Sequence, residues 1–244
     1  MSPPRPTLRV EKRLLREGRL RVLCVDECGR GSLGGPASAG VAMIDASVTR
    51  PLRGLRDSKL LSPRAREALV PKIHRWVVAG AVGHAGAAEV DALGLTAALR
   101  LAAHRAIATL PMQADVVLLD GNHDWLTPPG QQSLFGPVLA LEAQAATATL
   151  TIPEVLTIPE VLTIPEVLTM IKADLHCAGV AAASVLAKVE RDALMRNLAA
   201  QYPGYGWAEN KGYASRQHLE ALARLGPCVE HRRTWRLPTP QSAL

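Results

Sequence analysis

The sequence has few aromatic residues and lacks the features of a secreted or membrane protein. Aromatic residues make up 3% of the 244 positions, with one phenylalanine, so the core must consist mainly of leucine, valine, isoleucine and alanine. No apolar run is long enough to span a membrane. Charges interrupt the N-terminal segment where a secretory signal would need an apolar block, so we expect a cytoplasmic protein.

Cysteine is also scarce, and its spacing matches no metal site. The chain has four cysteines, without a Cys-x-x-Cys pair and without the Cys/His spacing of a zinc site. We interpret all four as small buried apolar residues: Cys24, Cys28, Cys177 and Cys228.

The bulk composition is that of a folded, basic protein. Apolar residues make up 48% of the chain, which argues against global disorder, and the length suits one domain with an appendage or two small domains. The formal net charge is +6 and the pI is about 9.5, which favours a polyanionic partner such as nucleic acid.

Local patterns predict alternating strands and helices. Apolar segments predict strands at 21–25, 37–44, 77–84, 114–120 and 168–174. Residues 114–120 form a continuous apolar run, typical of a parallel strand buried on both faces, and we expect 168–174 to be a second such strand. Helical patterns cover 63–76, 87–110 with a break near Gly94, 179–201 and a segment after the Gly/Tyr-rich loop. Residues 1–20 are basic and predict either a ragged arm or a short first helix.

A tandem repeat interrupts the pattern. TIPEVL occurs three times, at 151–156, 157–162 and 163–168. A proline every six residues prevents a continuous helix and interrupts a central strand. We expect an extended surface loop, with a binding element as the alternative.

The stretch GRGSLG, residues 29–34, fits the G-x-G-x-x-G pattern of dinucleotide-binding loops. Such a loop needs a helix to begin within it and an acid about 20 residues further on, and this sequence provides neither. Asp26 and Glu27, just before the loop, would also repel a pyrophosphate. The pattern is therefore a poor match for a cofactor loop.

The two acids suggest a different chemistry. Asp26 and Glu27 follow one predicted strand, and Asp120 and Asp174 end two others. Ligands of parallel α/β sheets gather beyond the carboxyl ends of the strands. Four carboxylates there could hold a hard cation for two-metal phosphodiester chemistry, while each acid alone could equally be a turn residue.

Five blocks resemble, in order, those of the type 2 ribonuclease H (ribonuclease HII) family. They are VDECGRGSLGGP, RDSKLLS, LLDGN, KADLHCAGVAAASVLAKVERDALM and YGWAENKGYASRQHLEAL. The resemblance implies an α/β, ribonuclease H-like fold, with a mixed central sheet flanked by helices and a small helical C-terminal portion. It divides the chain into a basic arm (1–20), a catalytic domain (21–200) with an inserted loop at about 122–168, and a C-terminal substrate-binding portion (201–244).

The resemblance also implies a function. Members hydrolyse the RNA strand of RNA-DNA hybrids and cut 5′ of ribonucleotides embedded in duplex DNA, leaving 3′-hydroxyl and 5′-phosphate ends. Mg²⁺ or Mn²⁺ is expected on the catalytic acids Asp26, Glu27, Asp120 and Asp174. We expect a monomer, with RNA-DNA hybrid and ribonucleotide-containing duplex DNA as partners, and no membrane or clamp-binding tail.

The same resemblance assigns substrate contacts. Gly29, Arg30 and Gly31 would recognise the 2′-hydroxyl through close backbone contacts, and Tyr213 would pack on the sugar beyond the junction. Lys59 is a candidate phosphate contact.

Three polar residues share one face of the long helix by their spacing: Ser184, Lys188 and Arg191. Lys188 and Arg191 would touch the phosphate backbone or, alternatively, belong to a solvated or internally paired polar stripe.

Some positions depart from the family pattern. Cys28 stands where alanine is usual, Ala173 replaces the glycine of K-G-D, and His176 replaces a common lysine. Asp124 is a rival acid close to Asp120. Two other functions stay open: a non-catalytic hybrid-binding module that uses the basic charge alone, and a nucleotide-cofactor enzyme that uses GRGSLG.

Overall fold

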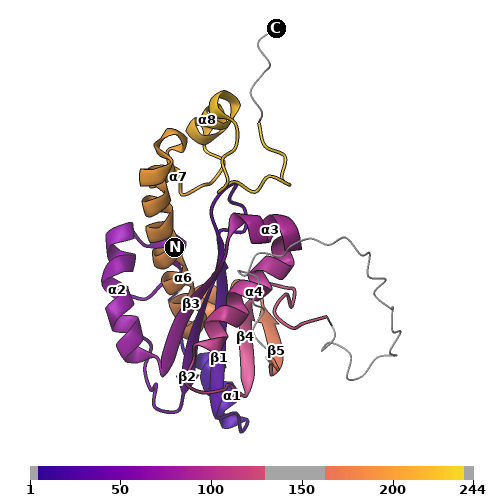
Figure 1. Cartoon of the computed structure of the whole chain (residues 1–244). Coiled ribbons are helices and arrows are strands. Elements are labelled where there is room, and N and C mark those ends of the chain that lie inside the picture. The colour runs from indigo at the N-terminus through magenta and orange to yellow at the C-terminus, as the bar shows by residue number, and fades with distance from the viewer. Residues whose placement is uncertain (1–4, 130–162, 239–244) are drawn as a thin grey trace, which may run out of the picture.

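The computed structural model describes residues 5–129 and 163–238, which form a five-stranded mixed sheet with helices on both faces (Figure 1). The strand order is β3-β2-β1-β4-β5. Strand β1 is antiparallel to β2 and parallel to β4, β2 is antiparallel to β3, and β4 is parallel to β5. The mixed sheet implied by the resemblance is confirmed. The strands are β1 (Arg21–Cys28), β2 (Ala37–Asp45), β3 (Ala79–Ala85), β4 (Val116–Asp120) and β5 (Glu166–Met170).

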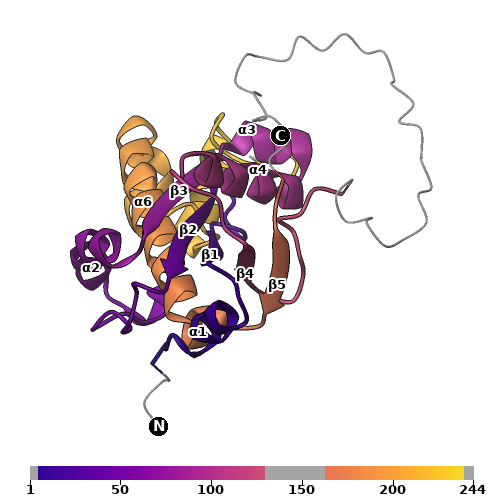
Figure 2. The same ribbon diagram turned by 90° about the horizontal axis from the view of Figure 1, so that it is seen from below.

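Helices cover the two faces of the sheet unequally. Helices α2 and α6 lie on one face and α3 and α4 on the other (Figure 2). The helices are α1 (Arg9–Arg16), α2 (Pro63–Trp76), α3 (Ala87–Leu93), α4 (Leu95–Ala108), α5 (Ala173–His176), α6 (Ala178–Gln201), α7 (Trp207–Asn210) and α8 (Arg216–Leu225), with 3-10 turns η1 (Ser58–Leu60) and η2 (Pro203–Tyr205).

The side chains of strand β1 pack in two separate hydrophobic cores, one on each face of the sheet. Because successive side chains of a strand point to opposite faces, Val22 and Cys24 pack in the core under α6, whereas Leu23 and Val25 pack under α4. Both faces are buried, which explains the continuous apolar run and the absence of a polar alternation.

The predicted helix boundaries are confirmed where capping signals exist. The Ser62 hydroxyl accepts a hydrogen bond from the Ala65 N–H, and Pro63 occupies the first position of α2. Gly94, with a φ of 77°, separates α3 from α4, because the left-handed region favours glycine.

The strand predicted at 168–174 is wrong in its boundaries and its burial. β5 runs from Glu166 to Met170, and it is a partly exposed edge strand because no strand pairs with its outer side in the described sheet. Lys172 then adopts a left-handed conformation, with a φ of 58°, and turns the chain into α5. Asp174 therefore lies in a short helix and not at a strand end.

Both segments expected to lie outside the core contribute to it. Residues 9–16 form a helix with Leu14 buried, so the short-helix alternative holds and the ragged arm does not. Within the proposed inserted loop, Trp125 and Ile164 are buried, and the end of the third TIPEVL copy belongs to β5. The first two copies lie outside the described residues.

The C-terminal portion packs on the end of α6. Its small core contains Met195, Tyr205, Trp207 and Leu222, and Tyr205 and Trp207 stack with ring centroids 5.3 Å apart. Two of the few aromatic residues, Tyr205 and Trp207, are thus buried in this portion, while the cores against the sheet are mainly aliphatic. Its separation at residue 201 as a substrate-binding unit stays a prediction. None of the helices in the described ranges is long and apolar enough to cross a membrane.

Candidate active site

Two acids meet at the carboxyl ends of the central parallel strands. Val25 of β1 pairs with Leu119 of β4, so Asp26 and Asp120 follow side by side. Both acids continue the strand positions that face α6, since Val22 and Cys24, like Val116 and Leu118, pack on that side. Asp26 lies within β1, which runs on to Cys28, and does not follow the strand as predicted.

Helix α6 approaches these acids closely because small residues line its contact with the sheet. A Cβ atom added at Gly40, the residue paired with Asp26, would lie 2.2 Å from the Ala183 carbonyl oxygen of α6. The next residue of the helix, Ser184, is buried, and its hydroxyl lies 2.9 Å from that of Ser58. The close approach brings α6 over the acids and joins it to η1.

A pocket of about 470 Å³ opens beside this junction. It is lined by Asp26, Glu27, Cys28, Gly29, Arg30, Gly31, Ser58, Lys59, Ser184, Lys188 and Tyr213. Nine of the twelve residues predicted from the sequence as site residues therefore converge on one hollow, although they come from four separated segments.

Asp120 and the residue before Asp174 are joined by a backbone contact, and neither acid is among the described residues that line the pocket. The Ala173 N–H donates to Asp120 Oδ1 at 2.6 Å, which fixes the start of α5 against the end of β4. Asp174, the next residue, is buried, and its Oδ2 lies 3.7 Å from Lys59 Nζ. Lys59 is mostly exposed, so it can also meet a ligand from solvent.

The acids interact electrostatically. Burial, and then the neighbouring charge of Glu27, raise the pKa of Asp26 well above its ordinary value, and Asp120 and Asp174 add to the shift. Burial also raises the pKa of Glu27, against the opposing effect of Arg30. For Asp174, burial and then Asp120 raise the pKa to about 6. A cation would relieve this accumulation of negative charge.

One carboxylate oxygen is available for such a cation. Glu27 Oε2 is buried and has no hydrogen-bond partner, whereas Oε1 accepts a bond from Arg30 Nε at 3.1 Å. A buried carboxylate oxygen without a partner is costly, and oxygen ligands of this kind suit Mg²⁺ or Mn²⁺. The donor set thus fits a hard divalent cation. Among the described residues, however, no three acid, histidine or cysteine side chains converge as a ready metal site, so the binding of an ion by several acids would require their side chains to rotate.

The glycine loop follows Asp26 and Glu27 in the sequence and lines the same pocket. Its first two glycines, Gly29 and Gly31, differ in their surroundings. Gly29 has a φ of 86°, and a Cβ there would lie 2.2 Å from Arg191 Nε. Gly31 has no atom within 4 Å of its hypothetical Cβ, so nothing in the fold requires glycine at this position. Glycine at 29 therefore serves the fold, and glycine at 31 leaves space beside the pocket.

Tyr213 closes the pocket from the C-terminal portion. Its ring lies over Lys188 Nζ at 5.7 Å and over the Arg191 guanidinium at 5.3 Å. Burial, and then the proximity of Cys28, raise the pKa of Tyr213 to about 12, so the phenol stays neutral. The phenol ring is half-buried and presents a flat apolar surface to the pocket.

The stripe on α6 divides into different roles. Lys188 Nζ donates to Asp192 Oδ1 at 2.7 Å and still lines the pocket. Arg191, predicted as a possible phosphate contact, has no exposed surface, and its hydrogen bonds all go to protein groups. This burial favours the internally paired alternative for Arg191 over a phosphate contact.

The rival acid has a local role. Asp124 Oδ1 accepts hydrogen bonds from the N–H groups of Leu126 and Thr127, at 2.9 and 3.0 Å, and so stabilises the turn after β4. Its carboxylate is thereby engaged in the turn that buries Trp125, while Asp120 faces the acids.

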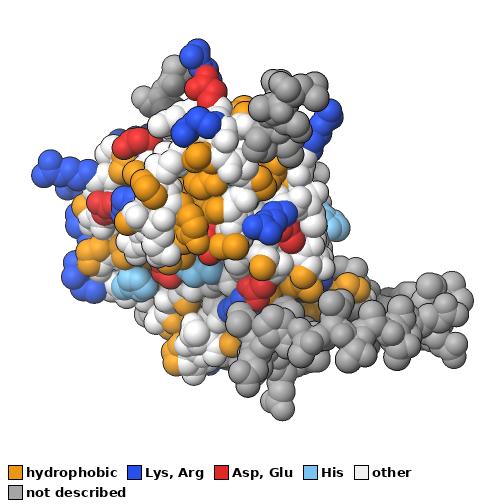
Figure 3. Space-filling view, turned by 45° about the horizontal axis from the view of Figure 1, so that its top comes forward, with side chains coloured by type: hydrophobic (Ala, Val, Ile, Leu, Met, Phe, Trp, Pro, Cys, Tyr) orange, Lys and Arg blue, Asp and Glu red, His pale blue; other side chains and the backbone are white. Residues whose placement is uncertain are grey.

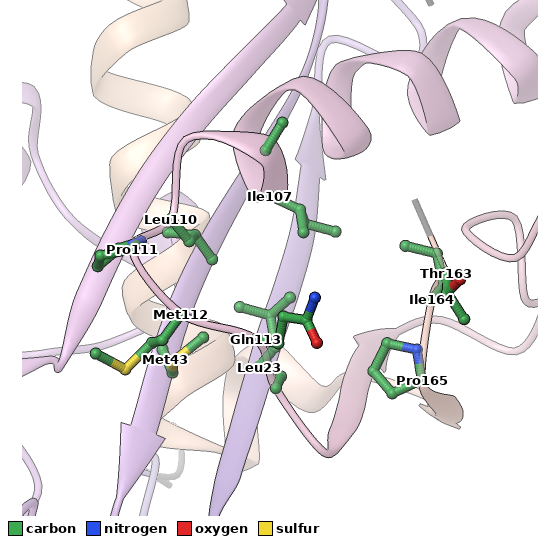
Figure 4. A pocket seen from close by; sticks show the side chains of 12 residues that line it. Leu23, Met43, Ile107, Leu110, Pro111, Met112, Gln113, Thr163, Ile164 and Pro165 are labelled. Carbon is green, nitrogen blue, oxygen red and sulfur yellow. The ribbon is translucent and has the colours of Figure 1, made fainter. Parts of the chain in front are cut away.

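Two surface features lie outside the site. A larger hollow, of about 610 Å³, lies at the opposite end of the sheet and is mainly apolar, with Met43, Leu110 and Ile164 in its lining (Figure 4). Its lining includes no acid, histidine, lysine or arginine. On the face seen in Figure 3, basic and acidic side chains are interspersed and form no single patch of one sign.

Sequence reasoning missed one residue that contacts the glycine loop. Arg232 is buried, and its Nη2 donates to the Gly29 carbonyl at 2.7 Å across 203 positions of sequence. The surrounding HRRTW segment gives no periodic or spacing signal for this contact. Only the folded chain brings the two segments together.

A mixed sheet of this order, with acids at the ends of adjacent parallel strands under a long helix, defines the ribonuclease H-like fold. The family model for ribonuclease HII matches residues 23–237, and the chain belongs to this family. It is therefore a ribonuclease H enzyme, and the family predicted from the five blocks is confirmed.

Individual proteins agree with this assignment. A ribonuclease HII of Streptomyces avermitilis is 40% identical over 231 residues, which cover 94% of this chain and 83% of the relative. The ribonuclease H2 of Pyrococcus horikoshii OT3 has a similar structure, with a TM-score of 0.61 at 24% identity, covering 89% of this chain and 94% of that one. Bst-RNase HIII in complex with Mn²⁺ shares the fold at 20% identity and a TM-score of 0.54, over 84% of this chain and 61% of that one.

Proposed function

We propose that this enzyme hydrolyses the RNA strand of RNA-DNA hybrids and cuts 5′ of ribonucleotides embedded in duplex DNA, leaving 3′-hydroxyl and 5′-phosphate ends. The observation that carries the proposal is one pocket with both halves of such a site. Its lining contains Asp26 and Glu27 and also the Gly29–Gly31 segment and Tyr213. Chemistry on a phosphate and recognition of the adjacent sugar would therefore take place within one nucleotide's length.

The acids Asp26, Glu27, Asp120 and Asp174 would hold Mg²⁺ or Mn²⁺. The unpartnered oxygen of Glu27 and the raised pKa values of Asp26 and Asp174 support this role, because each reflects negative charge without sufficient compensation. When bound, the cation would activate a water molecule and stabilise negative charge on the phosphate. In this structure Arg30 pairs with Glu27, and Lys59 pairs with Asp174. Both basic side chains could contact the phosphate instead once a cation binds the acids.

The remaining pocket residues would bind the substrate. The backbone of Gly29, Arg30 and Gly31 would contact the 2′-hydroxyl, the group that distinguishes RNA from DNA at a site. Lys59 and Lys188 would contact phosphates, and Ser184 would hold Asp26 in place, because its hydrogen bond favours the charged form of that acid. Tyr213 would pack on the sugar 3′ of the ribonucleotide.

The protein would act in the cytoplasm as a monomer. A catalytically inactive hybrid-binding module, the alternative function, would have no need of four acids that interact electrostatically at one end of the sheet. Membership of a family of ribonucleases also favours the enzyme. The expectation that no clamp-binding tail is present falls partly on residues 239–244, which lie outside the described ranges.

A direct test uses a duplex that contains one ribonucleotide, incubated with the protein with and without Mg²⁺ and resolved on a sequencing gel. The expected result is one metal-dependent cut on the 5′ side of the ribonucleotide. The product should be extendable by a polymerase, which requires a 3′-hydroxyl. Binding without any cut, on this substrate and on an RNA-DNA hybrid, would favour the inactive binding module.

A further inference from the structure

Two buried arginines lie beneath the glycine loop. Arg191 of α6 and Arg232 near the C-terminus are both 0% exposed, and neither forms a salt bridge within the described ranges. Burying two cations without acids is costly unless their N–H groups are satisfied. The hydrogen-bond partners of these N–H groups show which part of the fold the two arginines hold in place.

The partners are mainly carbonyl groups of the loop. Arg232 Nη2 donates to Gly29 O at 2.7 Å and to Gly35 O at 3.4 Å, and Nη1 donates to Arg30 O at 3.0 Å. The planar guanidinium therefore bridges the start and the end of the loop, and it fixes two consecutive carbonyls at the start.

Arg191 holds the other end of the loop. Its Nε donates to Pro36 O at 2.9 Å, and its Nη2 donates to Ser32 Oγ at 2.8 Å and to Gly34 O at 3.3 Å. The same side chain occupies the space next to Gly29 that a Cβ would need. The two guanidinium groups together determine the direction of most carbonyls in the loop.

The direction of the carbonyls fixes the direction of the amides. In a trans peptide the N–H points opposite to the carbonyl of the preceding residue. Because Gly29 O and Arg30 O point toward Arg232, the N–H groups of Arg30 and Gly31 point away from it. Neither N–H has an acceptor among the described residues, and both residues are exposed and line the active-site pocket.

Successive free N–H groups of this kind form a concave site for an oxygen atom. The buried guanidinium groups behind the loop add positive potential to it. Burial, and then the charge of Arg191, lower the pKa of Arg232 to about 10, so the guanidinium stays charged at neutral pH. An oxygen of a ribose or phosphate is the group that such a site would accept.

The C-terminal segment is itself anchored to the loop, which explains how Arg232 is held. The backbone N–H of Arg232 donates to Leu33 O at 2.9 Å, and the Gly35 N–H donates to Glu230 O at 2.8 Å. Trp235 lies over the guanidinium at 4.9 Å. The backbone around Arg232 is thus hydrogen-bonded to the glycine loop, which holds the Arg232 side chain in a fixed position beside it.

We infer that Arg232, with Arg191, is a positioning residue for substrate recognition: it orients the Arg30 and Gly31 amides toward the 2′-hydroxyl of the ribonucleotide. This inference rests on the proposed function and names the residues that make the glycine loop selective. Arg232 does not touch the substrate, and it acts through the backbone of the loop.

The test compares Arg232→Lys with wild type and with Arg233→Lys, a matched control at the exposed neighbouring arginine. Lysine keeps the charge but cannot bond two consecutive carbonyls in a planar fork. Dissociation constants are measured by fluorescence anisotropy in EDTA for two duplexes that differ only in one 2′-hydroxyl. Thermal melting confirms that each variant is folded.

For wild type and Arg233→Lys we expect tighter binding of the ribonucleotide-containing duplex. Arg232→Lys should reduce that preference about tenfold or abolish it, with affinity for the all-DNA duplex unchanged within about twofold. Equal weakening on both duplexes, or an unchanged preference, would refute the positioning role. Absence of any preference in wild type would refute the proposed recognition of the 2′-hydroxyl and this inference with it. If Arg232→Lys is unstable, Arg191→Lys provides the same comparison with the same expected outcomes.

Discussion

The Ala173 N–H donates to Asp120 Oδ1 at 2.6 Å, so the carboxylate that ends β4 also holds the first residue of α5. Through this bond Asp174, the next residue, is brought to the other acids although it belongs to a different element. The bond joins the two elements across 53 positions of sequence. The bond also means that a substitution at Asp120 must preserve its acceptor oxygen if the fold is to be left intact.

Asp120→Asn meets that requirement, since the amide oxygen can still accept the Ala173 N–H. We expect cleavage of the one-ribonucleotide duplex to fall at least a hundredfold, because a metal-binding carboxylate is lost and each 1.4 kcal/mol of transition-state stabilisation is worth about tenfold. Asp26→Asn should behave alike. Binding of an RNA-DNA hybrid should change by only a few-fold, measured by anisotropy alongside a gel assay.

Asp124→Asn is the matched control for this prediction. Its oxygen can still accept the two turn N–H groups, and we place Asp124 outside the metal site. Activity should stay near that of wild type. If Asp124→Asn lost activity and Asp120→Asn kept it, the assignment of the third acid would be reversed.

The glycine loop allows fold and recognition to be separated. Gly31→Ala should keep the wild-type melting temperature, because its Cβ meets no atom of the protein. It should nevertheless reduce cleavage of a single embedded ribonucleotide by roughly 10- to 1,000-fold, because the methyl group would obstruct the sugar. Normal activity would show that the substrate does not approach Gly31.

Gly29→Ala provides the contrast. A residue with a φ of 86° whose Cβ would collide with Arg191 should destabilise the fold by at least about 1–3 kcal/mol. Urea unfolding should detect this loss, which would be absent in Gly31→Ala.

Tyr213 should matter most where a deoxyribose follows the cut. Tyr213→Ala should lose roughly 10- to 1,000-fold on a single ribonucleotide in DNA and less on a continuous RNA strand paired with DNA, since its ring packs on the sugar. Tyr213→Phe keeps the ring and serves as the control, with activity near that of wild type. Equal losses for Tyr213→Ala on both substrates would exclude recognition of the junction.

Deleting residues 151–162, two copies of the repeat, should change the free energy of unfolding by about 1 kcal/mol or less, because loop closure depends only logarithmically on length. Activity should also be retained. Urea unfolding and the gel assay test both points, and loss of folded protein or of activity would give the repeat a structural or functional role.

A point substitution distinguishes the copies. Ile164→Ala, in the third copy, should cost about 2–5 kcal/mol, because this side chain is buried under α4. Ile158→Ala, at the same place of the second copy, should cost little if that copy is surface loop as predicted. Equal costs would contradict this difference between the copies.

Glu11 should make stability depend on pH. Burial raises its pKa from 4.5 to about 7 against opposing backbone hydrogen bonds, so between these pH values the folded chain retains a proton that the unfolded chain has lost. The free energy of unfolding should therefore fall as pH rises from about 4.5 to 7, by on the order of 3 kcal/mol.

Glu11→Gln cannot ionise and should lack this part of the pH dependence, so its stability relative to wild type should increase between pH 4 and pH 8. Glu17→Gln, at the exposed end of the same helix, is the control and should follow the wild-type curve. Chemical denaturation at several pH values measures the difference. Parallel curves for wild type and Glu11→Gln would mean that Glu11 has the same pKa in the folded and unfolded states, and would contradict the prediction.

The sequence by itself was sufficient for most of the elements and for nine of the residues that line the pocket. Capping and periodicity place α2 and the break at Gly94, because these signals are local and act within a few residues. The motif blocks predicted the acids and the loop, since each block keeps its chemistry in consecutive residues. The apolar runs place Asp26 and Asp120 at the ends of predicted strands, but the register of β1 with β4, which sets the two acids side by side, comes from the structure.

Only the tertiary structure decided which polar groups are free to act. Arg191 and Lys188 lie on one helical face, yet burial against the loop commits Arg191 to backbone carbonyls while Lys188 still lines the pocket. Arg232 contacts Gly29 across 203 positions, a pairing that no local pattern encodes. Asp174 was predicted at a strand end but lies in a helix, because the left-handed conformation of Lys172 turns the chain before it. Hydrogen-bond partners and burial depend on what the folded chain brings from elsewhere, and a linear pattern cannot specify them.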